Sequence, residues 1–432
     1  MSSFLFAMFE GGGNVPLLVP VVRAVVERGH DVTVVAGPSI RRPNPPPAAS
    51  GRLVDPLRDA GARVVQLLDE PLHPLDGFVL GTAILGRTPP SLHGAVDAGR
   101  IARWSRPWAE RLAPVIEDAQ PAALVCDFFL YGALAAGEAA GIPTAALVHN
   151  CTVLWPLPGL PLPPPGALPL AGPRGWVRDR LWAAAHQHIA RREGAVHLDA
   201  ARVALGLPPL DAPPDEQVMR ADRVLVLGTR EFELPLRGPL PENVRYVGTI
   251  LEDDASARWE PAVHGDQPWV LVSMSTLPQG QAPVMRNVLE AIAGLPVRAV
   301  VTLGPTLAHD SFDAPANVQV ETFVPHEAVL PHVSAVITQC GLGTISKVLA
   351  RGLPMVCLPV LGDQPANAAR IQRLGAGLRL SHDAPPADIG RALRRVLDEP
   401  SFRVAAENYA SAVGREDPRR TVVAELEALL PP

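Results

Sequence analysis

Cysteine is scarce in this sequence, and the patterns in which cysteine usually has a structural role are missing. The 432 residues contain only Cys126, Cys151, Cys340 and Cys357, which lie far apart and form no CxxC pair. We therefore interpret them as buried free thiols in a reducing, cytoplasmic compartment. No cluster of Asp, Glu and His has metal-ligand spacing either, so we expect no metal site.

Charged residues are also few, at 19% of the chain, and they give a net charge of −6 without any Lys/Arg cluster. This distribution disfavours a nucleic-acid partner, because such partners are bound through dense positive charge. No apolar run approaches the roughly 20 residues of a membrane-spanning helix, so we expect no membrane span. The chain enters an apolar strand at residues 4–9 without a basic region or a cleavage site, which also favours the cytoplasm.

Apolar side chains and proline, in contrast, are abundant. Hydrophobic residues make up 47% of 432 residues, which is enough for two sizeable cores and exceeds one ordinary domain. Many of the 49 prolines lie in two segments, 43–47 and 156–173, which can be neither helix nor central strand. We predict long, stiffened loops there, of the kind that often contribute to binding sites.

Apolar strands alternate with helical patterns along the chain. In the first half we expect strands at residues 4–9, 31–36, 62–67, 122–126, 144–148, 223–227 and 244–247. In the second half we expect strands at residues 269–272, 298–302, 318–321, 335–337 and 355–358. Strand–helix–strand repetition predicts parallel sheets with helices on both faces. The predicted fold class is α/β, with two doubly wound, Rossmann-like domains that face each other across a cleft.

A charged, irregular stretch separates the two series of strands. We place a linker at residues 253–266, between an N-terminal domain at 1–252 and a C-terminal domain at 267–399. The final residues, 400–432, are mostly helical in pattern. In folds of this type, ligands bind at the carboxyl ends of the strands.

The most informative stretch, residues 336–380, indicates a strand, a glycine-rich turn, a helix, a second strand and a polar loop. The turn is Gln339-Cys340-Gly341-Leu342-Gly343-Thr344. Its glycines let a ligand approach the backbone, and free N–H groups at the start of the next helix favour an anion. A diphosphate is the natural occupant, although many turns of this kind serve only tight packing.

A second polar element follows the next strand. Asp363 and Gln364 place hydrogen-bond acceptors and donors side by side at the carboxyl end of that strand, which is the mixture that sugar hydroxyls need. Asp363 could alternatively be the N-cap of the helix that follows. Together the two elements predict a nucleotide-sugar donor pocket.

The pattern GLGTxxxxLARGLPMVCLPxxxDQxxNAARxxxxGAG, which starts at Gly341, resembles the donor signature of inverting nucleotide-sugar glycosyltransferases with the GT-B fold. It is most similar to the UDP-glycosyltransferase-like group that modifies natural products such as antibiotics and macrolides. The resemblance covers most of the chain and is strongest over residues 325–380. It implies donor contacts from Ser273, Ser275, Thr276, Val324, Gln339, Gly341, Gly343, Thr344, Lys347, Asp363 and Gln364.

Two of these donor residues depart from the family pattern. Gln339 stands where the family usually has a phosphate-binding His, and Lys347 stands where it often has a Glu that holds the ribose hydroxyls. We place Lys347 in the first turn of its helix, where the helix dipole disfavours a cation. Lys347 either reaches the diphosphate or is a solvated surface lysine. The loss of a ribose acceptor would also fit a deoxyribose donor such as a dTDP-sugar.

A third departure concerns the general base. The family has a catalytic His shortly after its first strand, and this chain has Asn14 there, which cannot accept a proton near pH 7. Asp127 matches the acidic partner of that His, or is a helix N-cap. Three explanations stay open: the base is Asp127, His149 or Glu10; the acceptor needs no base; or the chain is a non-catalytic, donor-binding homologue or partner protein. A GT-B sugar-nucleotide epimerase is a further alternative.

The resemblance implies that the N-terminal domain binds the acceptor and that the last helix returns to pack on this domain. The expected apolar lining of the acceptor site includes Phe128, Phe129, Leu80 and Trp155. The predicted function is inverting transfer of a sugar from a dTDP- or UDP-sugar to a hydrophobic natural product. The resemblance implies no metal and no cofactor. The sequence leaves the oligomeric state open, with a homodimer as one alternative.

Overall fold

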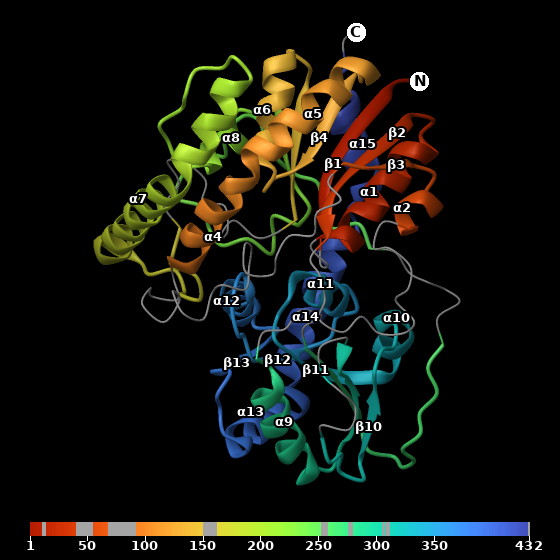
Figure 1. Cartoon of the computed structure of the whole chain (residues 1–432). Coiled ribbons are helices and arrows are strands. Elements are labelled where there is room, and N and C mark those ends of the chain that lie inside the picture. Colours follow the sequence, from red (N-terminus) through yellow and green to blue (C-terminus); the bar gives the residue numbers. More distant parts are fainter. Residues whose placement is uncertain are drawn as a thin grey trace.

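The computed structural model describes residues 1–10, 14–39, 55–67, 92–149, 162–251, 258–274, 280–304, 307 and 312–430. These ranges form two parallel sheets, one in each half of the chain, and helices flank both sheets (Figure 1). The predicted α/β class with two doubly wound units is confirmed. The linker at 253–266 lies partly outside the described residues, so the domain boundary stays a prediction.

Seven parallel strands form the N-terminal sheet, in the order β3-β2-β1-β4-β5-β6-β7. They are β1 (Ser3–Glu10), β2 (Asp31–Ser39), β3 (Arg63–Gln66), β4 (Ala123–Asp127), β5 (Thr144–Val148), β6 (Arg223–Val226) and β7 (Val244–Tyr246). Every residue of β4 and of β5 is buried. Continuous buried runs are typical of a parallel sheet that helices cover on both sides.

The N-terminal half has its helices on both faces of this sheet. They are α1 (Val15–Glu27), α2 (Asp55–Asp59), α4 (His93–Ile101), η3 (Ala102–Trp104), α5 (Ser105–Ala119), α6 (Tyr131–Ala140), α7 (Gly172–Ala204) and α8 (Asp215–Met219). Along β1, Phe4 and Phe6 pack into one core with side chains of α1, whereas Leu5 and Ala7 pack into another with side chains of α5 and α6. This alternation is the period of two that a strand imposes.

Six parallel strands form the C-terminal sheet, in the order β10-β9-β8-β11-β12-β13. They are β8 (Trp269–Ser273), β9 (Arg298–Thr302), β10 (Val318–Glu321), β11 (Val333–Thr338), β12 (Met355–Cys357) and β13 (Gly377–Arg379). The helices are α9 (Ala282–Ala293), α10 (His326–Val329), η6 (Leu330–His332), α11 (Leu342–Ala350), α12 (Gln364–Leu374), α13 (Pro386–Asp398), α14 (Pro400–Val413) and α15 (Pro418–Glu427). The sequence analysis did not predict β13, which has only three residues.

The last two helices pack on different halves of the molecule. Helix α14 contacts α11 of the C-terminal half, whereas α15 contacts α1 of the N-terminal half. Glu427 of α15 accepts hydrogen bonds from Arg28 at 2.9 Å and His30 at 3.1 Å. Val422 and Leu426 are buried in the core beneath α1. Helix α15 therefore packs on the N-terminal half.

A buried ion pair joins α12 to the N-terminal half. Arg370 Nε donates to Glu233 Oε1 at 2.9 Å, and the two side chains are 0% and 3% exposed. Nearby, Thr229 and Tyr409 share a hydrogen bond of 2.7 Å between their hydroxyls. Buried charges are stable only when paired, so the ion pair holds α12 at a fixed place against the N-terminal half.

None of the helices in the described part of the chain is long and apolar enough to cross a membrane.

Removal of one partner of the buried pair is predicted to destabilise the protein strongly. In Arg370→Met, Glu233 would stay buried without its partner, and we expect the free energy of unfolding to fall by about 3–5 kcal/mol. Urea unfolding followed by circular dichroism measures this. The control is Arg395→Met, which removes an exposed pair with Glu399 and should leave the urea midpoint unchanged. Equal midpoints for the two variants would show that the buried pair does not hold the halves together.

Candidate active site

The Asp127 carboxylate, at the end of β4, lies at the centre of a buried hydrogen-bond network. Its Oδ1 accepts a hydrogen bond from the Phe129 N–H at 3.1 Å. Its Oδ2 accepts one from Asn14 Nδ2 at 3.1 Å and one from His149 Nε2 at 2.9 Å. The residue is only 6% exposed. Three donors thus share its two oxygens, and Asp127 holds the side chains of Asn14 and His149 in place.

His149 follows β5, and its ring neighbours both Asp127 and two aromatic rings. The ring centroids of Phe128 and Phe129 are 5.2 Å and 6.0 Å away, in edge-to-face arrangement. Burial alone would lower the pKa of His149, but the charge and hydrogen bond of Asp127 outweigh it, with help from the charge of Asp363, and this pKa is raised. His149 is therefore a group that can accept a proton near neutral pH.

Asn14 lies at the N-cap position of α1, but its side chain does not cap that helix. Its Nδ2 instead donates to the Phe9 carbonyl at 2.7 Å and to Asp127 at 3.1 Å. The side chains of Asn14, Asp127 and His149 border a cavity of about 10 Å³. The rest of its lining is Ala7, Leu18, Val125, Leu147 and Leu227. A cavity of that size holds about one water molecule. Asn14 thus positions the carboxylate.

The glycine-rich turn opens helix α11 at the carboxyl end of β11. Gly341 is the N-cap, and no side chain caps the helix there. A Cβ added to Gly341 or to Gly343 would meet no atom within 4 Å, so these glycines are not required for packing within the described chain. Thr344, in the first turn, is half-buried. The Thr344 N–H donates to the Gly341 carbonyl at 3.1 Å. The first N–H groups of a helix have no acceptor inside it, so those of Leu342 and Gly343, with the open space beside them, can hold an anion.

Gln339 lies immediately before this turn and is 5% exposed. Its Oε1 atom is buried without a hydrogen-bond partner in the described structure. A buried polar group without a partner costs roughly 1–3 kcal/mol, so the amide is a strong candidate to contact a ligand.

Lys347 lies in the last turn of α11 and not, as expected, in the first. The expectation was wrong because the helix begins at Leu342, which places Lys347 near the C-terminal end, where the dipole favours a cation. Its ammonium forms an ion pair with Glu327 of α10. Lys347 is also the only lysine in the chain. Whether it reaches the diphosphate stays a prediction, and Glu327 is a partner that the sequence analysis missed.

Ser273, at the end of β8, is 3% exposed and shares a hydrogen bond of 3.1 Å with His326 Nε2. Burial, with the positive charge of Lys347, lowers the pKa of His326 to about 4, so its ring is neutral at pH 7. Val324, just before α10, is buried in the core of the C-terminal half. His326 therefore orients the Ser273 hydroxyl at the carboxyl edge of the sheet.

The loop that contains Asp363 and Gln364 is fixed by hydrogen bonds within the loop. Gln364 Oε1 accepts from the N–H groups of Val360 and Leu361 at 2.8 Å and 3.1 Å, which fixes the loop. Asp363 is at the N-cap position of α12 but makes no side-chain cap hydrogen bond, so the alternative N-cap role is not observed. Asp363 Oδ2 instead accepts from Asn367 Nδ2 at 2.8 Å.

Asn367 was not among the candidate residues from the sequence. It joins the Asp363 loop to the glycine-rich turn. The side chain is fully buried, and its Nδ2 also donates to the Cys340 carbonyl at 2.9 Å. Burial raises the pKa of Asp363, and the hydrogen bond from Asn367 and the charge of His149 offset this only in part. The charges of Asp363 and His149 each shift the pKa of the other group, so the Asp363 loop and the Asp127 network are electrostatically coupled.

Some predicted residues are not open to a ligand here, and others lie outside the described residues. Phe128 and Phe129 are 0% and 5% exposed and belong to a core of the N-terminal half. Leu80, Trp155, Ser275 and Thr276, and the side chain of Glu10, lie outside the described residues. The acceptor lining stays a prediction.

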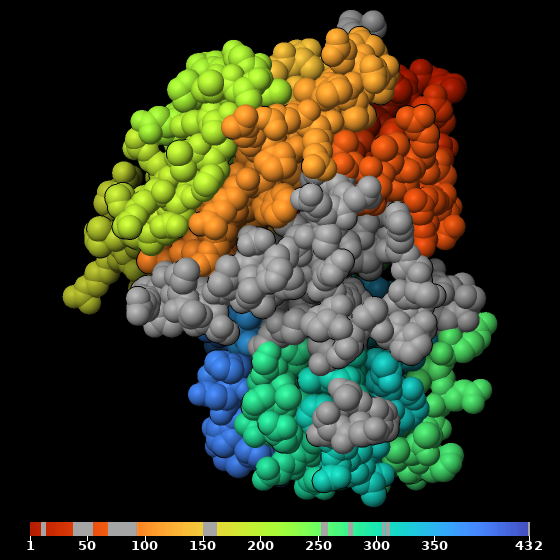
Figure 2. Space-filling view, viewed as in Figure 1, coloured from red at the N-terminus to blue at the C-terminus, as the bar shows by residue number. Residues whose placement is uncertain are grey.

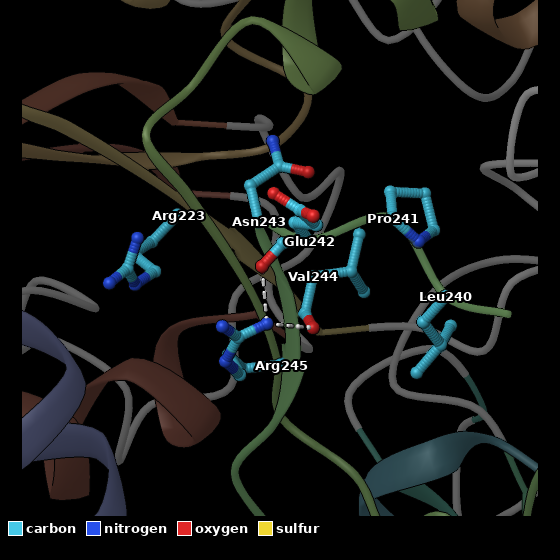
Figure 3. Close-up of a pocket in the computed structure, with 7 residues that line it drawn as sticks. All are labelled: Arg223, Leu240, Pro241, Glu242, Asn243, Val244 and Arg245. Carbon is cyan, nitrogen blue, oxygen red and sulfur yellow. Dashed lines mark hydrogen bonds between the residues drawn. The ribbon is translucent and has the colours of Figure 1, made fainter.

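A larger surface hollow, of about 690 Å³, lies elsewhere on the N-terminal half (Figure 3). Its lining consists of Arg223, Leu240, Pro241, Glu242, Asn243, Val244 and Arg245. Arg223 and Val244 are the first residues of β6 and β7, so the hollow is at the amino ends of the strands. Ligands of doubly wound folds bind at the opposite edge, where the network of Asp127 lies.

Comparison with known proteins agrees with this geometry. Residues 286–429 match a family model described as "Erythromycin biosynthesis protein CIII-like, C-terminal domain". The 4'-demethylrebeccamycin synthase of Lentzea aerocolonigenes is 30% identical over 440 residues, which cover 99% of each chain. This chain belongs to the natural-product glycosyltransferase family. Glycosyltransferase GtfE of Amycolatopsis orientalis is also 30% identical, over 65% of this glycosyltransferase and 68% of GtfE.

Solved structures show that the fold of this glycosyltransferase is GT-B. The glycotransferase of kitacinnamycin superposes with a TM-score of 0.75 at 21% identity, over 100% of this chain and 99% of that chain. Glycosyltransferase VinC, crystallised in complex with DTDP, superposes with a TM-score of 0.68 at 19% identity, over 99% of both chains. The predicted resemblance to this family, and an enzymatic role as a glycosyltransferase, are confirmed.

The pairing of His149 with Asp127 leads to a prediction about its pKa. In Asp127→Asn, the negative charge is lost but burial remains, so the pKa of His149 should fall below the ordinary histidine value of about 6.5. An NMR titration of the imidazole signals measures this, with His149→Gln to assign the signal. Asp118→Asn, at an exposed position on α5, is the matched control and should leave the pKa unchanged. An unaltered titration in Asp127→Asn would rule out the coupling.

Proposed function

We propose that this glycosyltransferase moves a sugar, with inversion, from a dTDP- or UDP-sugar to a hydrophobic natural-product acceptor, and that His149 takes the acceptor's proton. The observation that carries the proposal is the 2.9 Å hydrogen bond between His149 Nε2 and Asp127 Oδ2. It joins the carboxyl ends of two neighbouring strands, β4 and β5. Such a pair is the combination of base and orienting carboxylate that acid–base catalysis uses.

The pair of His149 with Asp127 can accept a proton, which the Asn14 side chain cannot do. A histidine at residue 14 would approach Asp127 from the end of β1, whereas His149 approaches the same carboxylate from the end of β5. When Nε2–H donates to Asp127, the lone pair of the neutral ring is on Nδ1, and this atom takes the proton. The charge of Asp127 then stabilises the imidazolium that forms.

The reaction would proceed by in-line displacement. The acceptor's oxygen or nitrogen attacks the anomeric carbon, the bond from this carbon to the diphosphate oxygen breaks, and the acceptor's proton passes to His149. Negative charge that develops on the departing diphosphate would be stabilised by the N–H groups at the start of α11 and by the side-chain N–H of Gln339. Asp363 and Gln364 would bind the sugar hydroxyls.

The names of similar proteins support the proposed classes of sugar donor and acceptor. VinC has the same fold and binds DTDP, and a relative over about half of this chain is a UDP-glycosyltransferase. The relative that aligns over nearly the whole chain is named a 4'-demethylrebeccamycin synthase. We infer a nucleoside diphosphate sugar as the donor and a hydrophobic natural product as the acceptor. A thermal-shift screen of sugar nucleotides, followed by product masses with candidate acceptors, identifies the pair to use in the kinetic tests.

The proposal predicts the kinetics of His149→Gln. Loss of the base should lower kcat by about 10²–10⁴-fold, with little change in the KM for the donor. The matched control is His188→Gln, an exposed histidine on α7, which should keep wild-type kcat. If His149→Gln turns over at the wild-type rate, the acceptor needs no base or the base is another group. If the wild type transfers no sugar to any acceptor, the protein is a donor-binding homologue without turnover.

A further prediction concerns the single lysine. If Lys347 reaches the diphosphate, Lys347→Ala should raise the KM for the donor by about tenfold, because a charged hydrogen bond is lost. An amine-acylating reagent can modify only one side chain, that of Lys347, and a nucleoside diphosphate should protect it, as mass spectrometry would show. The control is Arg351→Ala at the end of the same helix. If the KM for the donor is unchanged and the nucleoside diphosphate does not protect Lys347, the role of Lys347 is limited to its ion pair with Glu327.

A further inference from the structure

Exposed apolar side chains gather at one end of α7. Ten large hydrophobic residues are exposed in the described part of the chain, and half of them lie between residues 168 and 181. They are Leu168 (38% exposed), Leu170 (47%), Trp176 (47%), Val177 (47%) and Leu181 (67%). Single exposed hydrophobics are ordinary, but a contiguous group usually marks an interaction surface. We refer to residues 168–181 as the α7 tip.

The loop and the helix of the α7 tip form one surface. Arg178 donates to the Leu168 carbonyl at 3.1 Å, and Arg237 donates to the Leu170 carbonyl at 3.0 Å. A Cβ on Gly175 would lie 2.1 Å from the Leu170 oxygen, so the loop lies directly against the helix. Figure 1 shows this end of α7 at the outer edge of the N-terminal half, and Figure 2 shows it as a projection. The surface is convex.

The charges around these apolar side chains are positive. Residues 162–187, all described, contain three arginines and one acidic residue, Asp179. Asp179 is 0% exposed and is paired with Arg178 and Arg237. Arg174 and Arg180 are exposed, and the Arg180 guanidinium stacks on the Trp176 ring at 4.7 Å. The exposed charge of the tip is therefore positive on a chain whose net charge is −6.

We propose that the α7 tip docks on an anionic lipid surface. A tryptophan and aliphatic side chains beside arginines are the combination that lies in a membrane interface, with the apolar groups among the acyl chains and the guanidinium groups at the headgroups. A convex projection suits insertion into lipid better than it suits a protein groove. Gly166, in the loop before the tip, accepts a hydrogen bond from Arg379 of the C-terminal half. Docking would thus bring a membrane close to the junction of the two halves.

Vesicle binding tests this proposal on the full-length protein, without any need for a known substrate. Wild type should co-sediment with vesicles that contain 30% phosphatidylglycerol in phosphatidylcholine and bind pure phosphatidylcholine vesicles far less. Trp176→Ser/Leu181→Ser should lower the partition coefficient at least about tenfold, because two large apolar side chains no longer insert. Arg174→Glu/Arg180→Glu should lower it by more than about fivefold for each position, and salt should weaken wild-type binding.

Matched controls lie on the same helix. Val196→Ser/Val203→Ser removes two hydrophobics that are 65% and 60% exposed but lie beyond the tip, and Arg191→Glu/Arg192→Glu reverses two exposed charges. Both controls should bind anionic vesicles like wild type. The proposal is overturned if wild type does not bind anionic vesicles, or if the controls lose binding as fully as the tip variants. It is also overturned if the tip variants only dissociate a dimer in size-exclusion chromatography, since the occupant would then be a second copy of the chain.

Discussion

The buried carboxylate of Asp127 determines how the catalytic end of the N-terminal sheet is arranged. A charge removed from water is stable only when hydrogen-bond donors surround it, and Asp127 has three such donors. Strand β4 lies between β1 and β5, so Asn14 and His149, which follow these neighbours, approach Asp127 from its two sides. Because Asn14 can only donate to the carboxylate, our proposal gives the role of proton acceptor to His149.

The C-terminal half completes this arrangement. The charge of Asp363 acts on the pKa of His149, and that of His149 acts on Asp363. Asp363 precedes helix α12, and the buried pair of Arg370 with Glu233 fixes that helix against the N-terminal half. Asn367 then ties the Asp363 loop to the turn before α11. A chain of buried polar contacts thus relates the positions of the Asp363 loop and the glycine-rich turn to that of the N-terminal half.

The fold could be predicted from the sequence because its parallel strands are short, continuous apolar runs between helical patterns. Asp363 and Gln364 could be named as candidates because they lie in the polar loop that follows such a strand. The pairing of Lys347 with Glu327 could not, because no periodicity relates an ion to a partner 20 residues earlier on another helix. The predicted start of α11 was too late in the sequence. The ends of helices are hard to predict, and Gly341 and Gly343 make this boundary harder to recognise. His149 was one of several possible bases, and only the fold shows that it meets Asp127.

The most direct test of the central claim is to compare two titrations of the wild-type enzyme. If His149 is the base, its neutral form is the active one, so kcat/KM for the acceptor should fall as the pH drops through the raised pKa of His149. The pKa from the acidic limb of this profile should equal the pKa of the His149 imidazole measured by NMR in the same buffer. A profile that is flat across the imidazole titration would contradict the account.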